Sequence, residues 1–125
     1  MNTIKLTTLA FILLVGSAYT NETDKYDDLR KQSNEAFTYG EQLKYRVHYG
    51  WINAASVDVN VAEKPVKVNG RSTYQVSAYG KTYRSFDWAF RVRDHFISYI
   101  DSQSVAPLKY WKKVEEDNYR DEDLV

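Results

Sequence analysis

The stretch that decides the fold is EQLKYRVHYGW, residues 41–51. Apolar side chains occupy every second position in it, and polar side chains lie between them. Successive side chains of a β-strand point to opposite faces, so this alternation predicts a strand with one apolar and one polar face. The apolar positions are Leu43, Tyr45, Val47, Tyr49 and Trp51.

A second alternating run follows at residues 55–61, where Ala55, Val57, Val59 and Val61 are separated by polar residues. The link at residues 52–54 is short, which predicts an antiparallel hairpin. Pro65 has no backbone N–H to give to a ladder and is expected to follow the end of this strand.

Turn signals and further alternation continue along the chain. Asn69-Gly70 predicts a type I′ turn, because both central residues of that turn need positive φ. Alternation predicts strands near residues 73–78, 86–93, 96–101 and 108–115, although Phe86 and Phe90 also have helical spacing. The fold class that follows is mainly β, an antiparallel sheet curled into a barrel or half-barrel.

The N-terminal residues look like an export signal. Lys5 precedes the apolar run at 6–15, and Gly16-Ser17-Ala18 supplies the small residues of a cleavage site. We therefore expect a signal peptide at 1–18 and a polar spacer at 19–36, which has room for a short helix. The β-rich domain is expected at 37–125. The apolar run at 6–15 is too short to cross a bilayer, so we expect no transmembrane span after cleavage.

Composition narrows the functional classes. The 125 residues suit one domain, and the 17 basic and 17 acidic side chains balance. The chain has no cysteine, which excludes disulfides, thiolate metal sites and a lipoprotein anchor. A basic and aromatic set could line a nucleic-acid groove, but export argues against a nucleic-acid partner. This set is Arg91, Arg93, Lys109, Lys112 and Lys113 with Phe96, Tyr110 and Trp111.

Charge is uneven near the C-terminus. Residues 81–113 carry seven basic and three acidic side chains, whereas residues 114–125 carry six acids and Arg120. The second segment is either an acidic tail or the point after which further strands of a longer domain follow. We expect the longer domain, because an unclosed sheet of this kind would leave its aromatic side chains without partners.

Three blocks occur in order along the chain: FTYGEQLKYRVHYGWINAASVDVNV (37–61), VNGRSTYQVSAYGKTYRSFDW (68–88) and RVRDHFISYIDSQSVAPLKYWKKVEEDNY (91–119). This ordered set resembles the exported bacterial family called domain of unknown function 3108. The resemblance implies a β-rich protein of the Gram-negative cell envelope, of Bacteroidota type, with no agreed activity. It also implies a domain that continues past Val125, so that this chain is an N-terminal fragment.

Catalytic patterns are weak. The two histidines, His48 and His95, have no cysteine or histidine partner at metal-ligand spacing, so we predict no metal and no cofactor. Asp94 and His95 are neighbours in a predicted strand and should face opposite sides. We therefore assign no catalytic residues, and the sequence favours a protein that is not an enzyme.

Aromatic side chains are the one positive clue. Seven of them fall on predicted apolar faces, where they either fill a core or line a groove for an apolar ligand. These candidate ligand-binding residues are Tyr45, Tyr49, Trp51, Tyr74, Phe86, Trp88 and Phe90.

Three functions are compatible with these sequence features. The first is a periplasmic binding or carrier module for an apolar ligand such as a lipid. The second is a structural or partner-binding envelope protein with a filled core. The third and weakest is an envelope hydrolase, in which acidic residues, or an acid and His95, would converge in a cleft.

Overall fold

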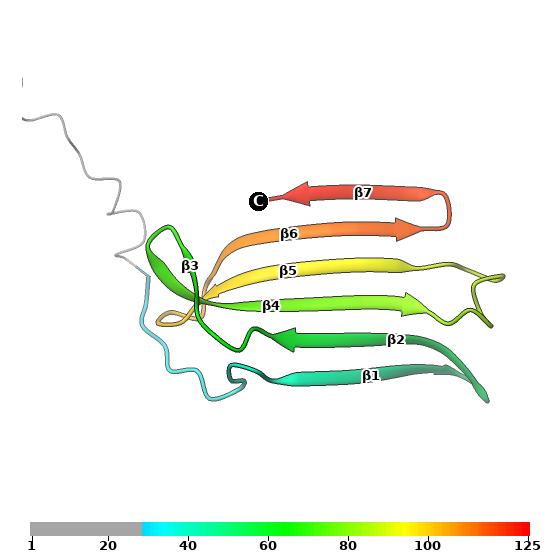
Figure 1. Ribbon diagram of the computed structural model, residues 1–125, viewed down its shortest axis with the longest axis horizontal. Helices are drawn as coiled ribbons and strands as arrows, with labels where there is room; N and C mark the ends of the chain where they lie inside the picture. Colours follow the sequence, from blue (N-terminus) through cyan, green and yellow to red (C-terminus); the bar gives the residue numbers. More distant parts are fainter. Residues whose placement is uncertain (1–28) are drawn as a thin grey trace, which may run out of the picture.

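The computed structural model describes residues 29–125, which form seven antiparallel strands joined by turns and no helix (Figure 1). The predicted signal peptide at 1–18 and most of the predicted spacer lie outside these residues. In the part of the spacer that is described, residues 29–36, the short helix does not form. The strands are β1 (Gln42–Tyr49), β2 (Ile52–Val61), β3 (Val66–Val68), β4 (Arg71–Thr82), β5 (Arg93–Asp101), β6 (Pro107–Glu116) and β7 (Tyr119–Leu124).

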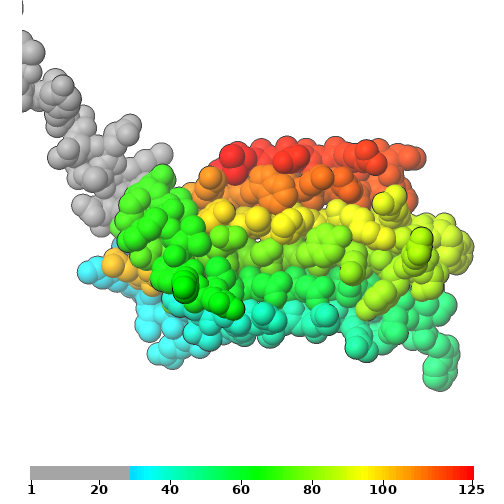
Figure 2. All heavy atoms as spheres, in the orientation of Figure 1, coloured from blue at the N-terminus to red at the C-terminus, as the bar shows by residue number. Residues whose placement is uncertain are grey.

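All seven strands belong to one sheet with the order β1-β2-β4-β5-β6-β7. The short strand β3 leaves this path and pairs with the first residues of β4. Figure 2 shows the strands of the main path as adjacent bands that follow chain order from cyan to red. The mainly β, antiparallel fold that the alternation predicts is therefore confirmed.

The sheet is open. Strands β1 and β7 lie at its two edges, and each pairs with a single neighbour. The sheet is thus not closed into a barrel: of the expected barrel or half-barrel, which we also expected to be incomplete in this chain, the described residues form the antiparallel sheet without closure. Charged residues on β7, among them Asp121 and Glu122, are typical of an edge strand that does not accept another strand.

Two turns set the register of the hairpins. Asn69 and Gly70 have φ of 49° and 76°, as the predicted type I′ turn requires. The first hairpin turns at Gly50-Trp51, ahead of the predicted link at 52–54, because Tyr49 pairs with Ile52 and Gly50 takes the positive φ of 59°. Glycine adopts that conformation without the steric cost of a Cβ.

The strand predicted over 86–93 is wrong except at its last residue, where β5 begins. Residues 83–92 form turns instead, with the N–H of Phe86 and the N–H of Asp87 both donating to the carbonyl of Tyr83. The carboxylate of Asp87 also accepts hydrogen bonds from Thr82 and Arg93, which closes the connection on itself. These side-chain bonds outweigh the local preference of the aromatic residues for a strand.

The acidic segment at the C-terminus is partly a strand. Residues Tyr119–Leu124 form β7 and pair with β6. Cross-strand charges support the pairing: Lys112 forms an ion pair with Asp121, and Lys113 lies directly opposite Glu122.

Little of the sheet is buried. Among residues 29–125 only Ala54 and Val61 are buried apolar side chains. The two side chains that are fully buried, Thr73 and Asp101, are polar. A sheet must cover its apolar face with a second layer to form a core. The described residues supply such a layer at one end of the sheet only.

Candidate ligand-binding face

The strand register gathers apolar side chains on one side of the sheet. Leu43 lies opposite Val59, Val59 opposite Ala78, and Ala78 opposite Phe96, so one apolar row crosses four strands. Cross-strand partners share a face. The neighbouring rows carry Tyr45 and Val57, or Val61 and Val76, but end at Asp94 and Ser98 on β5. We call this side the apolar face; its members are Leu43, Tyr45, Val47, Ala55, Val57, Val59, Val61, Tyr74, Val76, Ala78, Phe96 and Ile100.

The character of this side changes beyond β5. The same row continues from Phe96 to Lys112 and then to Asp123, both charged. Lys112 is ion-paired with Asp121, and this contact raises the pKa of its ammonium group. Lys112, Asp121 and Asp123 therefore form a charged border to the apolar face.

The apolar face is exposed to solvent along β1 and partly exposed on the other strands, except at Val61, which is buried. Along β1 the exposed fractions of Leu43, Tyr45 and Val47 lie between 42% and 53%. Single exposed apolar residues are ordinary, but a continuous exposed apolar surface marks a site of interaction.

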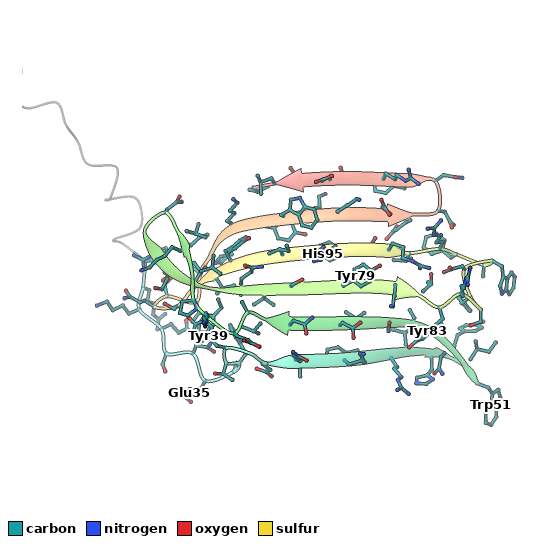
Figure 3. All side chains as sticks on the ribbon, viewed as in Figure 1. Glu35, Tyr39, Trp51, Tyr79, Tyr83 and His95 are labelled. Atoms are coloured by element: carbon teal, nitrogen blue, oxygen red, sulfur yellow. The ribbon has the colours of Figure 1, made fainter. Side chains whose placement is uncertain are left out.

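One end of the apolar face is covered by the strap, which we define as residues 34–41. The side chain of Asn34 donates to the carbonyl of Phe37 at 2.9 Å, and the N–H of Gly40 donates to the carbonyl of Ala62 at 3.2 Å. These bonds place two aromatic rings on Tyr74: Phe37 packs edge-on at 5.0 Å between centroids, and Tyr39 stacks at 4.4 Å. Burial, and to a lesser extent the neighbouring Tyr74, raise the pKa of Tyr39. Figure 3 shows Tyr39 at this end of the sheet.

A cavity of about 290 Å³ lies where the strap meets the apolar face. Its walls are apolar except for Glu41, whose carboxylate accepts a hydrogen bond from the N–H of Thr38. Such a cavity can take the end of an apolar chain that extends along the open part of the face. The lining residues are Ala36, Phe37, Glu41, Leu43, Val59, Val61, Val76 and Ile100.

A buried ion pair fixes the sheet at the same end. Asp101 is 1% exposed, and both of its oxygens accept hydrogen bonds from Arg71, at 2.8 and 2.9 Å. The backbone N–H and the hydroxyl of Ser104 donate to the same carboxylate. Arg71 and Ser104 hold the pKa of Asp101 well below its usual range. This cluster joins the start of β4 to the β5–β6 loop and has a structural role.

The seven aromatic residues predicted as ligand-binding separate into two groups. Tyr45 and Tyr74 lie on the apolar face. The other five lie at the opposite end of the sheet from the strap, in or beside two connections. Tyr49 and Trp51 belong to the β1–β2 turn, whereas Phe86, Trp88 and Phe90 belong to the β4–β5 connection.

Sequence reasoning overlooked the aliphatic residues of the cavity as candidate ligand contacts. Leu43, Val59 and Val61 carried the alternation that predicted the first hairpin, so the signal was present but was used only for the fold. Phe37 gave no such signal, because it reaches the cavity through the strap and not through a strand.

On the other side of the sheet, His95 lies between two aromatic rings. Its Nε2 is 2.9 Å from Ser77 Oγ, and its ring meets the rings of Tyr79 and Trp111 edge-on. Figure 3 shows His95 and Tyr79 on neighbouring strands. Asp94 points to the apolar side and accepts a hydrogen bond from the N–H of Glu115, so it does not pair with His95. Within residues 29–125 no group of three or more potential ligands is arranged to hold a metal ion.

The basic and aromatic set considered for nucleic acid is divided between the two sides. Lys112 shares the side of Phe96 and Tyr110, whereas Lys113 and Trp111 lie on the side of His95. These residues therefore do not form one groove. In the same described part of the chain, no helix is long and apolar enough to cross a membrane.

Fold and site together define an open antiparallel sheet with one exposed apolar face. A family model described as "Protein of unknown function (DUF3108)" matches residues 44–125, more than half of the chain. The chain belongs to this family, as the three sequence blocks indicated. No curated protein and no solved structure matches the chain.

Proposed function

We propose that this protein binds an apolar ligand, such as a lipid chain, on the apolar face of its sheet. The observation that carries the proposal is the apolar surface across β1, β2 and β4, which reaches β5 at Phe96 and Ile100 and which nothing in residues 29–125 covers outside the strap. In this arrangement the cavity under the strap holds the end of the chain.

Energetics favour an apolar occupant. Covering a half-exposed valine, leucine or tyrosine stabilises the complex by a fraction of the ~1.5–3 kcal/mol that full burial of such a side chain provides. Several such residues adjoin one another on this face, so an extended chain gains from each in turn. The hydroxyl of Tyr45 can form a hydrogen bond with a ligand that has a polar end.

A protein layer over the same face is the second candidate, either an envelope partner or further polypeptide that completes a half-barrel. The open edge of β1 favours it, since an edge strand can extend a sheet by pairing. A filled core has little support in the described residues, where only two apolar side chains are buried. We do not propose a hydrolase, because Asp94 and His95 face opposite sides of the sheet.

The proposed compartment is the periplasm of a Gram-negative bacterium, of Bacteroidota type. The export-like pattern of residues 1–18 and the family membership support it. The absence of cysteine argues against a lipoprotein anchor in that compartment.

The test uses two neighbouring positions of β1 that face opposite sides. Leu43→Glu places a carboxylate on the apolar face at the cavity, whereas Gln42→Glu places the same group on the polar side. We expect delipidated protein to enhance the fluorescence of Nile red, an apolar dye, and a long-chain fatty acid to displace it. Leu43→Glu should abolish this signal, because an unpaired charge in an apolar site is costly.

Gln42→Glu should bind Nile red and the fatty acid as the unchanged protein does. Circular dichroism of both variants checks that the sheet still forms. Equal binding by the two folded variants, or no displacement by the fatty acid, would refute the proposal.

A further inference from the structure

The end of the sheet farthest from the strap carries a second, separate cluster of aromatic side chains. The β1–β2 turn and the β4–β5 connection both lie there (Figure 1). Tyr49 and Phe86 join them, with 6.4 Å between ring centroids. We call this region the aromatic end; its residues are Tyr49, Trp51, Phe86, Trp88 and Phe90.

The aromatic end is unusually exposed. Trp51 is fully exposed, Trp88 is 85% exposed, and Tyr49 and Phe90 are also exposed. Figure 3 shows Trp51 extending from the β1–β2 turn beyond the strands. The indole N–H of Trp88 donates to the carbonyl of Ser85, which holds that ring in place without covering it. Large apolar rings that project into solvent on turns contribute little to folding.

Positive charge surrounds these rings. Residues 46–53 and 81–93 together contain five basic side chains and a single acid, Asp87, which is ion-paired with Arg93. A depression of about 650 Å³ lies at this end and is lined by Arg46, Arg84, Asn53, Tyr83 and Ser85. Within residues 29–125, Arg46 and Arg84 form no ion pair.

The border of the basic region is also defined. Asp117, in the β6–β7 turn, accepts a hydrogen bond from the N–H of Arg91 at 2.8 Å. Acidic residues at 115–117 therefore adjoin the basic region on the β6 side. The unpaired arginines lie away from them, beside β1 and β2.

We propose that the aromatic end docks on an anionic lipid membrane. Trp51 and Trp88 would lie at the level of the headgroups, where tryptophan and tyrosine rings are favoured because they combine an apolar body with a polar group. Arg46 and Arg84 would contact lipid phosphates, to which the guanidinium group binds with paired hydrogen bonds. The projecting rings and the lack of acidic partners favour a membrane over a packed protein interface. The apolar face and its cavity take no part in this contact.

The test measures co-sedimentation of the mature protein with vesicles of phosphatidylcholine, with and without phosphatidylglycerol. We expect binding to the anionic vesicles that weakens as salt is added, because screening shortens the reach of surface charges. Arg84→Gln should weaken the binding about fivefold, the effect of removing one basic group near an anionic surface. Arg84→Lys keeps the charge and should restore most of it. The double variant Trp51→Ala, Trp88→Ala should lose binding.

Two controls keep this test apart from that of the ligand site. Tyr119→Ala removes an exposed aromatic ring beside the acidic β6–β7 turn and should leave vesicle binding unchanged. Leu43→Glu should abolish Nile red binding and leave vesicle binding intact. Failure of the unchanged protein to sediment with anionic vesicles, or equal binding by the double tryptophan variant, would overturn the membrane proposal. The membrane proposal would also be overturned if the unchanged protein cross-linked to a protein partner but did not bind vesicles, and the double tryptophan variant lost that partner.

Discussion

An aspartate–arginine pair lies at each end of this sheet, and the two pairs differ in their surroundings. At the strap end, Asp101 is 1% exposed and binds both Arg71 and Ser104. At the aromatic end, the side chain of Asp87 is 21% exposed and binds Arg93 and Thr82. Two rings cover the sheet at the first end, whereas the rings at the second end point into solvent. The comparison indicates that the strap end stabilises the fold and that the aromatic end is available for interaction.

The largest expected effect is on stability at the strap end. Asp101→Ala removes the buried carboxylate that binds Arg71 and Ser104, and should lower the free energy of unfolding by about 3–5 kcal/mol. Urea denaturation measures this change. Asp87→Ala, at the aromatic end, should cost clearly less, because the Asp87 side chain is 21% exposed and water already screens its pair with Arg93, whereas the Asp101 side chain is 1% exposed. Equal losses in the two variants would contradict the distinction between the ends.

Acid should weaken the strap end. The pKa of Asp101 is lowered in the folded protein by Arg71 and Ser104, so its contribution to stability is complete above the unfolded pKa of about 4. That contribution is lost as the pH falls below this value towards the folded pKa. The free energy of unfolding should fall as the pH is lowered from about 6 to about 3, a range that spans the pKa of about 4 of an unfolded aspartate. Denaturation curves at several pH values measure this fall. Asp101→Asn should show a smaller fall, and an unchanged acid dependence would argue against the assignment.

A smaller effect is expected at the hairpin that adjoins the strap end. Gly70 has φ of 76°, so Gly70→Ala should cost about 1–2 kcal/mol, the penalty for an L-residue in the left-handed region. Gly80→Ala is the matched control, since Gly80 lies in β4 without positive φ and an added Cβ meets nothing within 4 Å. Thermal denaturation compares them, and a similar change in both variants would refute the turn assignment.

The smallest effect is expected at the aromatic end. Trp88→Ala removes a ring that is 85% exposed and should change the free energy of unfolding by less than about 0.5 kcal/mol. A larger loss in urea denaturation would show that this ring packs in the folded protein. It would then be a poor candidate for membrane contact.

Local patterns predicted much of the fold. Alternation at residues 43–49 and 55–61 predicted β1 and β2, and Asn69-Gly70 predicted the turn between β3 and β4. These features depend on residues that are close together in the chain and on the backbone preferences of Asn and Gly, so they can be predicted from the sequence. Strand β7 was overlooked because its charged residues show no apolar alternation, and its pairing depends on Lys112 and Lys113 of a different strand.

The connection at 83–92 shows where local pattern fails. Phe86, Trp88 and Phe90 alternate like strand residues, but Asp87 bonds to Thr82 and Arg93 and folds the segment into turns. The candidate site was predicted in part for the same reason. Tyr45 and Tyr74 follow strand periodicity and reach the apolar face, whereas the strap brings Phe37 to it from outside any strand.

The central claim is that an apolar ligand covers the exposed face, and native mass spectrometry of the protein isolated from the cells that produce it tests it most directly. We predict a population that carries extra non-covalent mass of lipid size, which organic extraction removes and which Leu43→Glu lacks. Protein without added mass, or bound only to another polypeptide, would contradict the claim and favour a protein layer over the sheet.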